Sequence, residues 1–284
     1  MDREPLLAIL ILLVAGPVVW MCGGILRFRE VHDPSPSGQE REATAWRQLW
    51  LPLIPSALLI IALFGWALSE PDDAEAMGVP WMLLALPVAF VWLRAFVRAL
   101  IALRAPRGNA MALTVGMVRP AVFIDPKLVG TLDEEALHAV TLHEMAHARH
   151  RDPFRIWLAQ IATDLQYPLP SARQRLVHWQ HALELARDDE ARMHGASGPA
   201  LADAIVTCAK MGGTPGTASA ALTGASLRIA ERVRRLVSSE LPPSMNGRRS
   251  PKHILSLLVM AGAFFVMGGA FGEDLVGGLL GVLR

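Results

Sequence analysis

Residues 131–153, TLDEEALHAVTLHEMAHARHRDP, decide how the polar part of this chain folds. Thr131 followed three residues later by Glu134 is a capping box, in which each side chain bonds the backbone N–H of the other. This pattern predicts a helix that begins near Leu132 and continues to about His150.

Two further helices are expected after this one. Asp152-Pro153 is an N-cap followed by proline at the first helical position, which starts a second helix. After a pair of prolines, Ser171 can cap a third helix that continues through Ala191 and stops near Gly195. The segment 153–167 is too short to span a bilayer, and we expect it to pack as core.

The first helix contains a metal-binding pattern, His143-Glu144-Met145-Ala146-His147. Histidines four residues apart lie one turn apart on the same helix face, so both imidazoles can reach one tetrahedral ion. The glutamate beside the first histidine can polarise a water molecule as a general base. We therefore predict Zn²⁺ as cofactor, with His143 and His147 as ligands and Glu144 as the catalytic residue.

A catalytic zinc site needs a third protein ligand and leaves the fourth position to water. The third helix reads HWQHALELARDDEA over residues 178–191. Glu184 and Asp188 lie four residues apart on one helix face, so one can bind the metal and the other can orient a ligand histidine. We predict Glu184 as the ligand and Asp188 as the orienting carboxylate; the alternative ligands are His178, His181 and His194.

The other polar residues near these motifs have simpler interpretations. Asp152 is expected to act only as a helix cap, and His138 to be structural. The sequence does not show which side chain would donate a hydrogen bond to the transition state. His181 and Arg187 are the candidates for this role. A solvated surface is expected for His150, Arg187, Asp189 and Glu190.

The segment before these helices has the pattern of two strands. MALTV at 111–115 and PAVFID at 120–125 are separated by a turn at Gly116. Pro120 suits an edge strand, so we expect a substrate peptide to add to the PAVFID strand. The glycine-rich stretch 212–226 is expected to be a loop.

The chain is 52% hydrophobic, which indicates membrane segments. A cleaved signal peptide fits the first apolar run poorly, because the run is long and no small-residue cleavage site closes it. Arg94 and Arg98, within the third run, are expected to snorkel to one face or to line a polar cavity. Four transmembrane helices are predicted at residues 6–26, 51–68, 80–103 and 254–272.

Arginine and lysine in the short connections predict the orientation of these helices. The connections after the first and third runs and before the fourth are basic, whereas SEPDDAEAMGV, between the second and third runs, has no basic residue. All basic connections lie on the cytoplasmic side if both termini are external. We therefore expect three domains: residues 1–103 with three transmembrane helices and a basic cytoplasmic loop, a cytoplasmic domain over 104–250, and residues 251–284 with the fourth helix and a short external tail.

Charge and cysteine content exclude other classes of protein. The formal net charge is +1, which argues against direct nucleic-acid binding. The two cysteines, Cys22 and Cys208, indicate no disulfide framework.

From Gly116 to Ala191, the stretches GMVRPAVFIDPKLVGTLDEEALHAVTLHEMAHARHRDP, YPLP and LELARDDEA resemble the BlaR/MecR-type membrane metallopeptidases. The segment RIAERVRRL at 228–236 can extend this resemblance. It implies a mainly α membrane protein of a bacterial inner membrane with a small α+β zincin-like (gluzincin) domain, whose ligands are His143, His147 and Glu184. It also implies an endopeptidase that cleaves a transcriptional repressor, or itself, in signal transduction.

One departure from that family concerns the signal. Its sensor members carry an external penicillin-binding domain after the last membrane helix, and only about a dozen residues follow Phe271 here. Direct β-lactam sensing is therefore not expected. The alternatives are a quality-control protease resembling the HtpX type, and a non-catalytic membrane receptor or scaffold.

Overall fold

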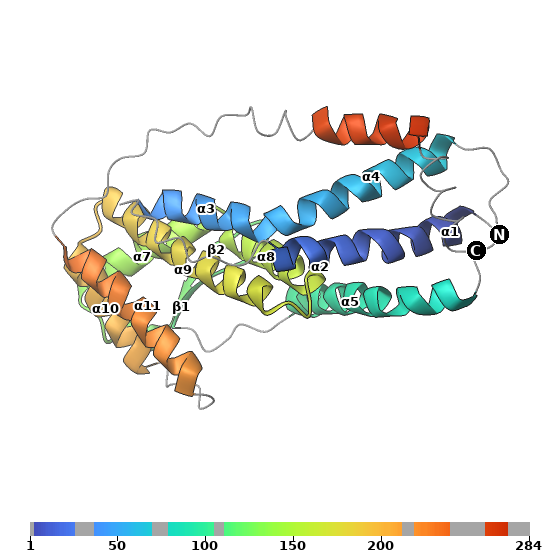
Figure 1. The fold of residues 1–284 in the computed structure, drawn as a ribbon. Coiled ribbons are helices and arrows are strands. Elements are labelled where there is room, and N and C mark those ends of the chain that lie inside the picture. Colours follow the sequence, from blue (N-terminus) through green and yellow to red (C-terminus); the bar gives the residue numbers. More distant parts are fainter. Residues whose placement is uncertain are drawn as a thin grey trace.

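The computed structural model describes residues 3–25, 37–69, 79–104, 111–211, 219–238 and 259–271. These residues are mostly helical, with one small two-stranded sheet. Long apolar helices form one end of the molecule, and polar helices with the sheet form the other (Figure 1).

Three of the apolar helices are long enough to cross a membrane: Leu6–Ile25, Gly38–Ser69 and Val79–Leu103. They agree with the first three predicted spans and make the chain a membrane protein by length and composition. The first helix consists of α1 (Arg3–Leu10), a π-helical turn η1 (Ile11–Ala15) and α2 (Gly16–Ile25). The second consists of α3 (Gly38–Trp50), a 3₁₀ turn η2 (Leu51–Leu53) and α4 (Ile54–Ser69). The third is α5 (Val79–Arg104).

A fourth apolar helix, Val259–Phe271, is shorter. At about 1.5 Å per residue it reaches roughly 20 Å, less than the roughly 30 Å of a bilayer core. The remaining residues of the predicted fourth span, 254–258 and 272, lie outside the described residues. A Cβ on Gly65 would meet the carbonyl oxygen of Phe265 at 2.2 Å, so this helix packs backbone to backbone on α4.

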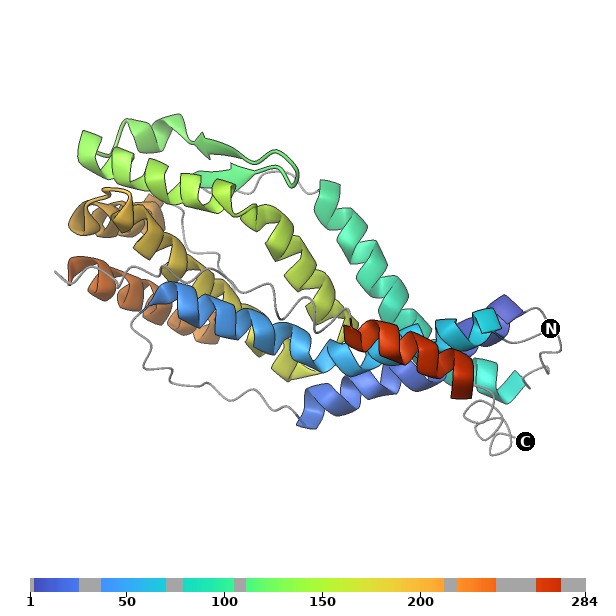
Figure 2. The same ribbon diagram turned by 90° about the horizontal axis from the view of Figure 1, so that it is seen from above.

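Part of the predicted basic loop between the first two spans is helical instead. Ser37 caps α3 by accepting a hydrogen bond from the backbone N–H of Glu40. Trp46 of α3 packs against Trp179 of α9 (Pro170–Met193), with ring centroids 5.0 Å apart. The second membrane helix therefore continues without a break into the polar half of the molecule (Figure 2).

The two predicted strands are confirmed. β1 (Ala112–Val115) pairs antiparallel with β2 (Ala121–Ile124). Gly116 has a φ of +97° at the turn that follows β1, a conformation that suits glycine. The short helix α6 (Pro126–Val129) then leads to the helix that carries the histidines.

That helix, α7 (Glu134–Arg149), begins two residues later than predicted. Its N-cap is Asp133, whose carboxylate accepts from the N–H of Ala136 at 2.7 Å. The predicted capping box is wrong, because the hydroxyl of Thr131 donates instead to the carbonyl of Lys127.

Helix α8 (Asp152–Leu165) and helix α9 follow at the predicted places. Ser171 does not cap α9, since its hydroxyl donates to the carbonyl of Gly23. The predicted stop is confirmed at Gly195, which has a φ of +99°.

The last two polar helices are α10 (Gly198–Met211) and α11 (Ser219–Val237). The predicted loop at 212–226 is therefore wrong for residues 219–226, and residues 212–218 lie outside the described part of the chain. The core around these helices is formed by side chains that are at most 2% exposed and that pack against Ala139 of α7, namely Leu201, Ala204 and Leu236.

The segment 153–167 packs as core, as predicted. Ala159 and Ala162 of α8 are fully buried. On another face of α8, Asp164 accepts hydrogen bonds from Arg94 and Arg98 of α5 at 3.2 and 2.9 Å. These two arginines are thus paired with a buried carboxylate, a partner that the sequence did not predict.

Candidate metal centre

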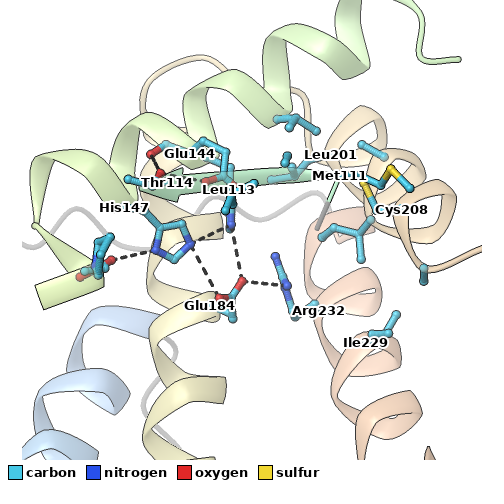
Figure 3. Close-up of a pocket in the computed structure, with 18 of the residues that line it drawn as sticks. Met111, Leu113, Thr114, Glu144, His147, Glu184, Leu201, Cys208, Ile229 and Arg232 are labelled. Atoms are coloured by element: carbon cyan, nitrogen blue, oxygen red, sulfur yellow. Dashed lines mark hydrogen bonds and ion pairs between the residues drawn. The ribbon is translucent and has the colours of Figure 1, made fainter. Parts of the chain in front are cut away.

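Three side chains from two helices converge at the centre of the polar half. His143 and His147 come from α7 and Glu184 comes from α9, and one ligand atom from each lies within 4.8 Å of the others. The two Nε2 atoms are 3.1 Å apart. The carboxylate of Glu184 lies 3.5 Å from Nε2 of His143 and 3.7 Å from Nε2 of His147 (Figure 3). Two imidazoles and one carboxylate at this separation are a donor set that suits zinc.

The opposite nitrogen of each ring faces a buried carboxylate. Nδ1 of His147 is 2.9 Å from Asp152, and Nδ1 of His143 is 3.0 Å from Asp188, although this second contact does not have the geometry of a hydrogen bond. A carboxylate at Nδ1 fixes the tautomer that leaves Nε2 free to bind a metal. Asp188 therefore lies where the sequence placed it.

The prediction that Asp152 acts only as the cap of α8 is wrong, because the N-cap is Arg151, no side chain makes a capping hydrogen bond, and Asp152 is the first residue of the helix. Its side chain is fully buried, and it accepts two hydrogen bonds from Arg187 at 2.5 and 3.0 Å besides its contact with His147. Burial alone would raise the pKa of Asp152, but the hydrogen bonds from His147 and Arg187 lower it below its ordinary range. The left-handed backbone of Arg151, with φ 52°, turns the chain so that Asp152 reaches back to His147.

Glu144 is held by the sheet. The hydroxyl of Thr114, on β1, lies 2.9 Å from both Oε2 and the main-chain oxygen of Glu144. The glutamate is 8% exposed and lines the same cavity as the two histidines. Strand β1 thus sets the position of the carboxylate that the motif predicts as the base.

Arg232 of α11 completes the centre, and the sequence analysis missed it. Its guanidinium lies 2.9 Å from Glu184 (Figure 3). It also makes two 2.8 Å hydrogen bonds to Asp188. The one available signal was the segment RIAERVRRL at 228–236, whose basic residues repeat at helical spacing.

The charges of the centre favour a bound cation. Burial alone would lower the pKa of His143, but the adjacent carboxylates of Asp188 and Glu184 outweigh it and raise this pKa to about 9. Burial would likewise raise the pKa values of Glu184 and Asp188, yet Arg232 and His143 hold both below their ordinary range. The carboxylates therefore stay ionised and draw a proton onto His143, as expected of a site that offers surplus negative charge to a metal.

The alternative ligands lie elsewhere. His181 pairs with Glu231 at 2.7 Å, and His194 contacts Arg149 at 2.6 Å. His178 does not belong to the triad either. Neither His181 nor Arg187 lines the cavity at the centre, so neither is placed to act on a substrate there.

The residues expected to form a solvated face are mostly buried. Arg187, Asp189 and Glu190 are at most 6% exposed. Asp189 accepts from the backbone N–H of Gly38 at 2.7 Å, and Glu190 accepts from His150 at 2.8 Å. These polar groups join α9 to its neighbours, and only His150 is substantially open to solvent, with its side chain 44% exposed.

A cavity of about 520 Å³ opens onto the triad. The residues around it come from β1, α7, the start of α8, α9, α10 and α11, and include Leu113, Leu201, Cys208 and Ile229 (Figure 3). No residue of β2 lines it, so the strand at the cavity is β1 and not the PAVFID strand that the sequence analysis chose.

Three protein donors beside an open cavity would leave a position free on a bound ion, whereas a closed structural zinc site has four protein ligands. Comparison of the chain with family models, curated proteins and solved structures found no match.

Proposed function

We propose that this chain is an integral-membrane zinc endopeptidase. The observation that carries the proposal is the grouping of three ligand atoms within 4.8 Å, from His143, His147 and Glu184, beside Glu144 and an open cavity. A purely structural zinc site would have four protein ligands. Among the described residues no fourth histidine, cysteine or carboxylate joins the triad.

The residues fit the metal in kind and in charge. His143, His147 and Glu184 would hold zinc, and Asp188 and Asp152 would keep the two imidazoles in the metal-binding tautomer. When bound, zinc supplies a Lewis acid and lowers the pKa of water towards neutrality.

The chain's own groups supply the remaining chemistry. Glu144 takes a proton from the attacking water and delivers it to the leaving amine. Thr114 holds that carboxylate in place through its hydroxyl. Among the described residues β1 pairs only with β2, so its other edge can take a substrate peptide as an added strand along the cavity.

The cellular role follows from the resemblance and from the basic connections. With both termini external, the polar half faces the cytoplasm, where the substrate is a regulatory protein such as a transcriptional repressor, or the chain itself. The HtpX-type alternative places membrane helices between the two metal motifs. α8, which lies between them here, is not among the helices long and apolar enough to span.

The first test is the zinc content of the detergent-purified protein and its cleavage of a fluorescently labelled unfolded protein. We expect about one zinc per chain and cleavage that a chelator abolishes, both lost in His147→Ala. His138→Ala is the matched control, because His138 is exposed on the same helix and should keep both. A wild type without zinc and without cleavage would refute the proposal.

A further inference from the structure

Helix α8 connects the metal centre to the membrane helices through buried charges. Its first residue, Asp152, orients His147. One turn later, Arg155 donates to the other oxygen of Asp152 at 3.1 Å. Asp152 is therefore held from two sides, by Arg187 of α9 and by Arg155 of α8 itself.

Arg155 is in turn held by the second membrane helix. Its guanidinium donates to Glu42 of α3, whose carboxylate is 3% exposed and also accepts from the indole of Trp179 at 3.2 Å. The guanidinium lies over the ring of Trp46, 4.9 Å from its centroid. Because α3 is continuous with the span that ends at Ser69, an unbroken series of contacts runs from His147 to that span.

The far end of α8 is fixed to the third membrane helix. Asp164, 5% exposed, accepts from Arg94 and Arg98 of α5 and from Gln160 of its own helix. Trp157 adds a hydrogen bond of 3.0 Å to the carbonyl of Ala99. Asp164 lies twelve residues after Asp152, which is roughly 18 Å along a helix, so it cannot touch the metal ligands.

We propose that α8 positions the metal centre from the membrane, with Glu42 and Asp164 as remote positioning residues for His147. The proposal rests on the metal site proposed above. Leaving a buried charge unpaired is costly, so a shift of α3 or α5 carries Arg155 or Asp164 with it and moves α8. The centre then responds to the second and third spans, and by linkage zinc binding strengthens their contacts with α8.

The test is zinc affinity, measured by competition with a chelator on the full-length protein in detergent. An orienting carboxylate is worth about 10- to 100-fold in metal affinity, which we expect for Asp152→Asn. Glu42→Gln and Asp164→Asn, one step further away, should weaken zinc binding about 3- to 10-fold. Glu40→Gln, the same change two residues before Glu42 and therefore on another side of α3, should alter it less than about twofold.

A double-mutant cycle separates positioning from general destabilisation. If Glu42 acts through Asp152, Glu42→Gln should add less than about a twofold effect in the Asp152→Asn background. Asp164→Glu, which keeps the charge, should retain most of the wild-type affinity. A variant that is weak only because it unfolds would instead give additive effects.

The outcomes distinguish this proposal from the proposed function. Wild-type protein that binds zinc tightly while Glu42→Gln and Asp164→Asn bind equally tightly would overturn the role of α8 and leave the peptidase intact. Full additivity in the cycle would also overturn it. Wild-type protein that binds no zinc would overturn the metal site and the positioning role together.

Discussion

The two histidines of the centre have the same kind of partner but different support. Asp188, beside His143, is braced by Arg232 from the C-terminal helix α11. Asp152, beside His147, is braced by Arg187 and by Arg155, which leads to the membrane helices. The arginine that braces Asp188 thus belongs to the C-terminal helix, which meets α3 next door at Glu231 and Arg41, whereas Arg155, which braces Asp152, itself bonds Glu42 of α3.

The difference also appears in the charges. On the His143 side, Arg232 is the cation that faces both Glu184 and Asp188. On the His147 side, Asp152 pairs with two arginines, and each of these also pairs with a glutamate, Arg155 with Glu42 and Arg187 with Glu190. We therefore expect the His143 side to depend strongly on whether a metal is present, and the His147 side to depend on the position of α8.

The largest effect is expected from breaking the His143 side with Arg232→Gln. Removing one partner from a buried ion pair costs about 3–5 kcal/mol, and here two carboxylates lose their cation. Because zinc would restore positive charge beside Glu184, the loss should be greatest without metal. Thermal unfolding with and without chelator measures it; equal losses in both conditions would contradict this account.

The stability of the metal-free protein should depend on pH through His143, on the same side of the centre. The pKa of His143 is raised from 6.5 to about 9 in the folded, metal-free protein. Its protonation therefore stabilises the fold fully below about pH 6.5, and this contribution, about 3 kcal/mol, is lost as the pH rises to about 9. Melting temperatures of metal-free protein over this range should fall, and Asp188→Asn should flatten the dependence.

Zinc loading should remove that pH dependence, since a histidine that binds metal carries no proton on the ligand nitrogen. If the loaded and metal-free proteins lost stability in parallel between pH 6.5 and 9, His143 would not be a ligand.

The two orienting carboxylates provide a direct comparison of the two sides. Asp188→Asn and Asp152→Asn should each weaken zinc binding about 10- to 100-fold. Only the Asp152 variant should become insensitive to a second change at Glu42. Chelator competition on the four single and double variants decides this, and the same insensitivity in the Asp188 background would erase the distinction between the sides.

The smallest effect is expected at Thr114, which contacts Glu144 and neither of the two orienting carboxylates. Thr114→Val removes the hydroxyl that holds Glu144 while keeping the shape of the side chain. A lost hydrogen bond to a charged group is worth about 1.5–3 kcal/mol, of which water entering the open cavity should recover part. We expect kcat to fall about 5- to 10-fold with zinc content unchanged; a change in zinc content would show that Thr114 supports the ligands instead.

The sequence could predict what helical spacing alone determines. His143 with His147, and Glu184 with Asp188, are pairs four residues apart, so their shared faces follow from the helix itself, and the structure brings these four residues together. The first three apolar helices were predictable from length and composition in the same way.

Features that depend on how helices pack could not be predicted in this way. Asp152 reaches His147 only because Arg151 adopts a left-handed conformation, and Arg232 arrives on a helix far along the chain. The helix α3 did have a local signal, Ser37 followed by Glu40, but its basic residues favoured a cytoplasmic loop. The edge of the sheet that meets the cavity depends on the packing of β1 against α7, which strand patterns do not reveal.

The most direct test of the central claim is the cleavage rate of zinc-loaded Glu144→Gln against that of zinc-loaded wild type. Glutamine preserves the shape of the side chain but cannot accept the proton, and general-base catalysis is worth about 10²- to 10⁴-fold. We expect a loss of that size with zinc content unchanged. Cleavage at the wild-type rate would contradict it and would show that Glu144 is not the base of this site.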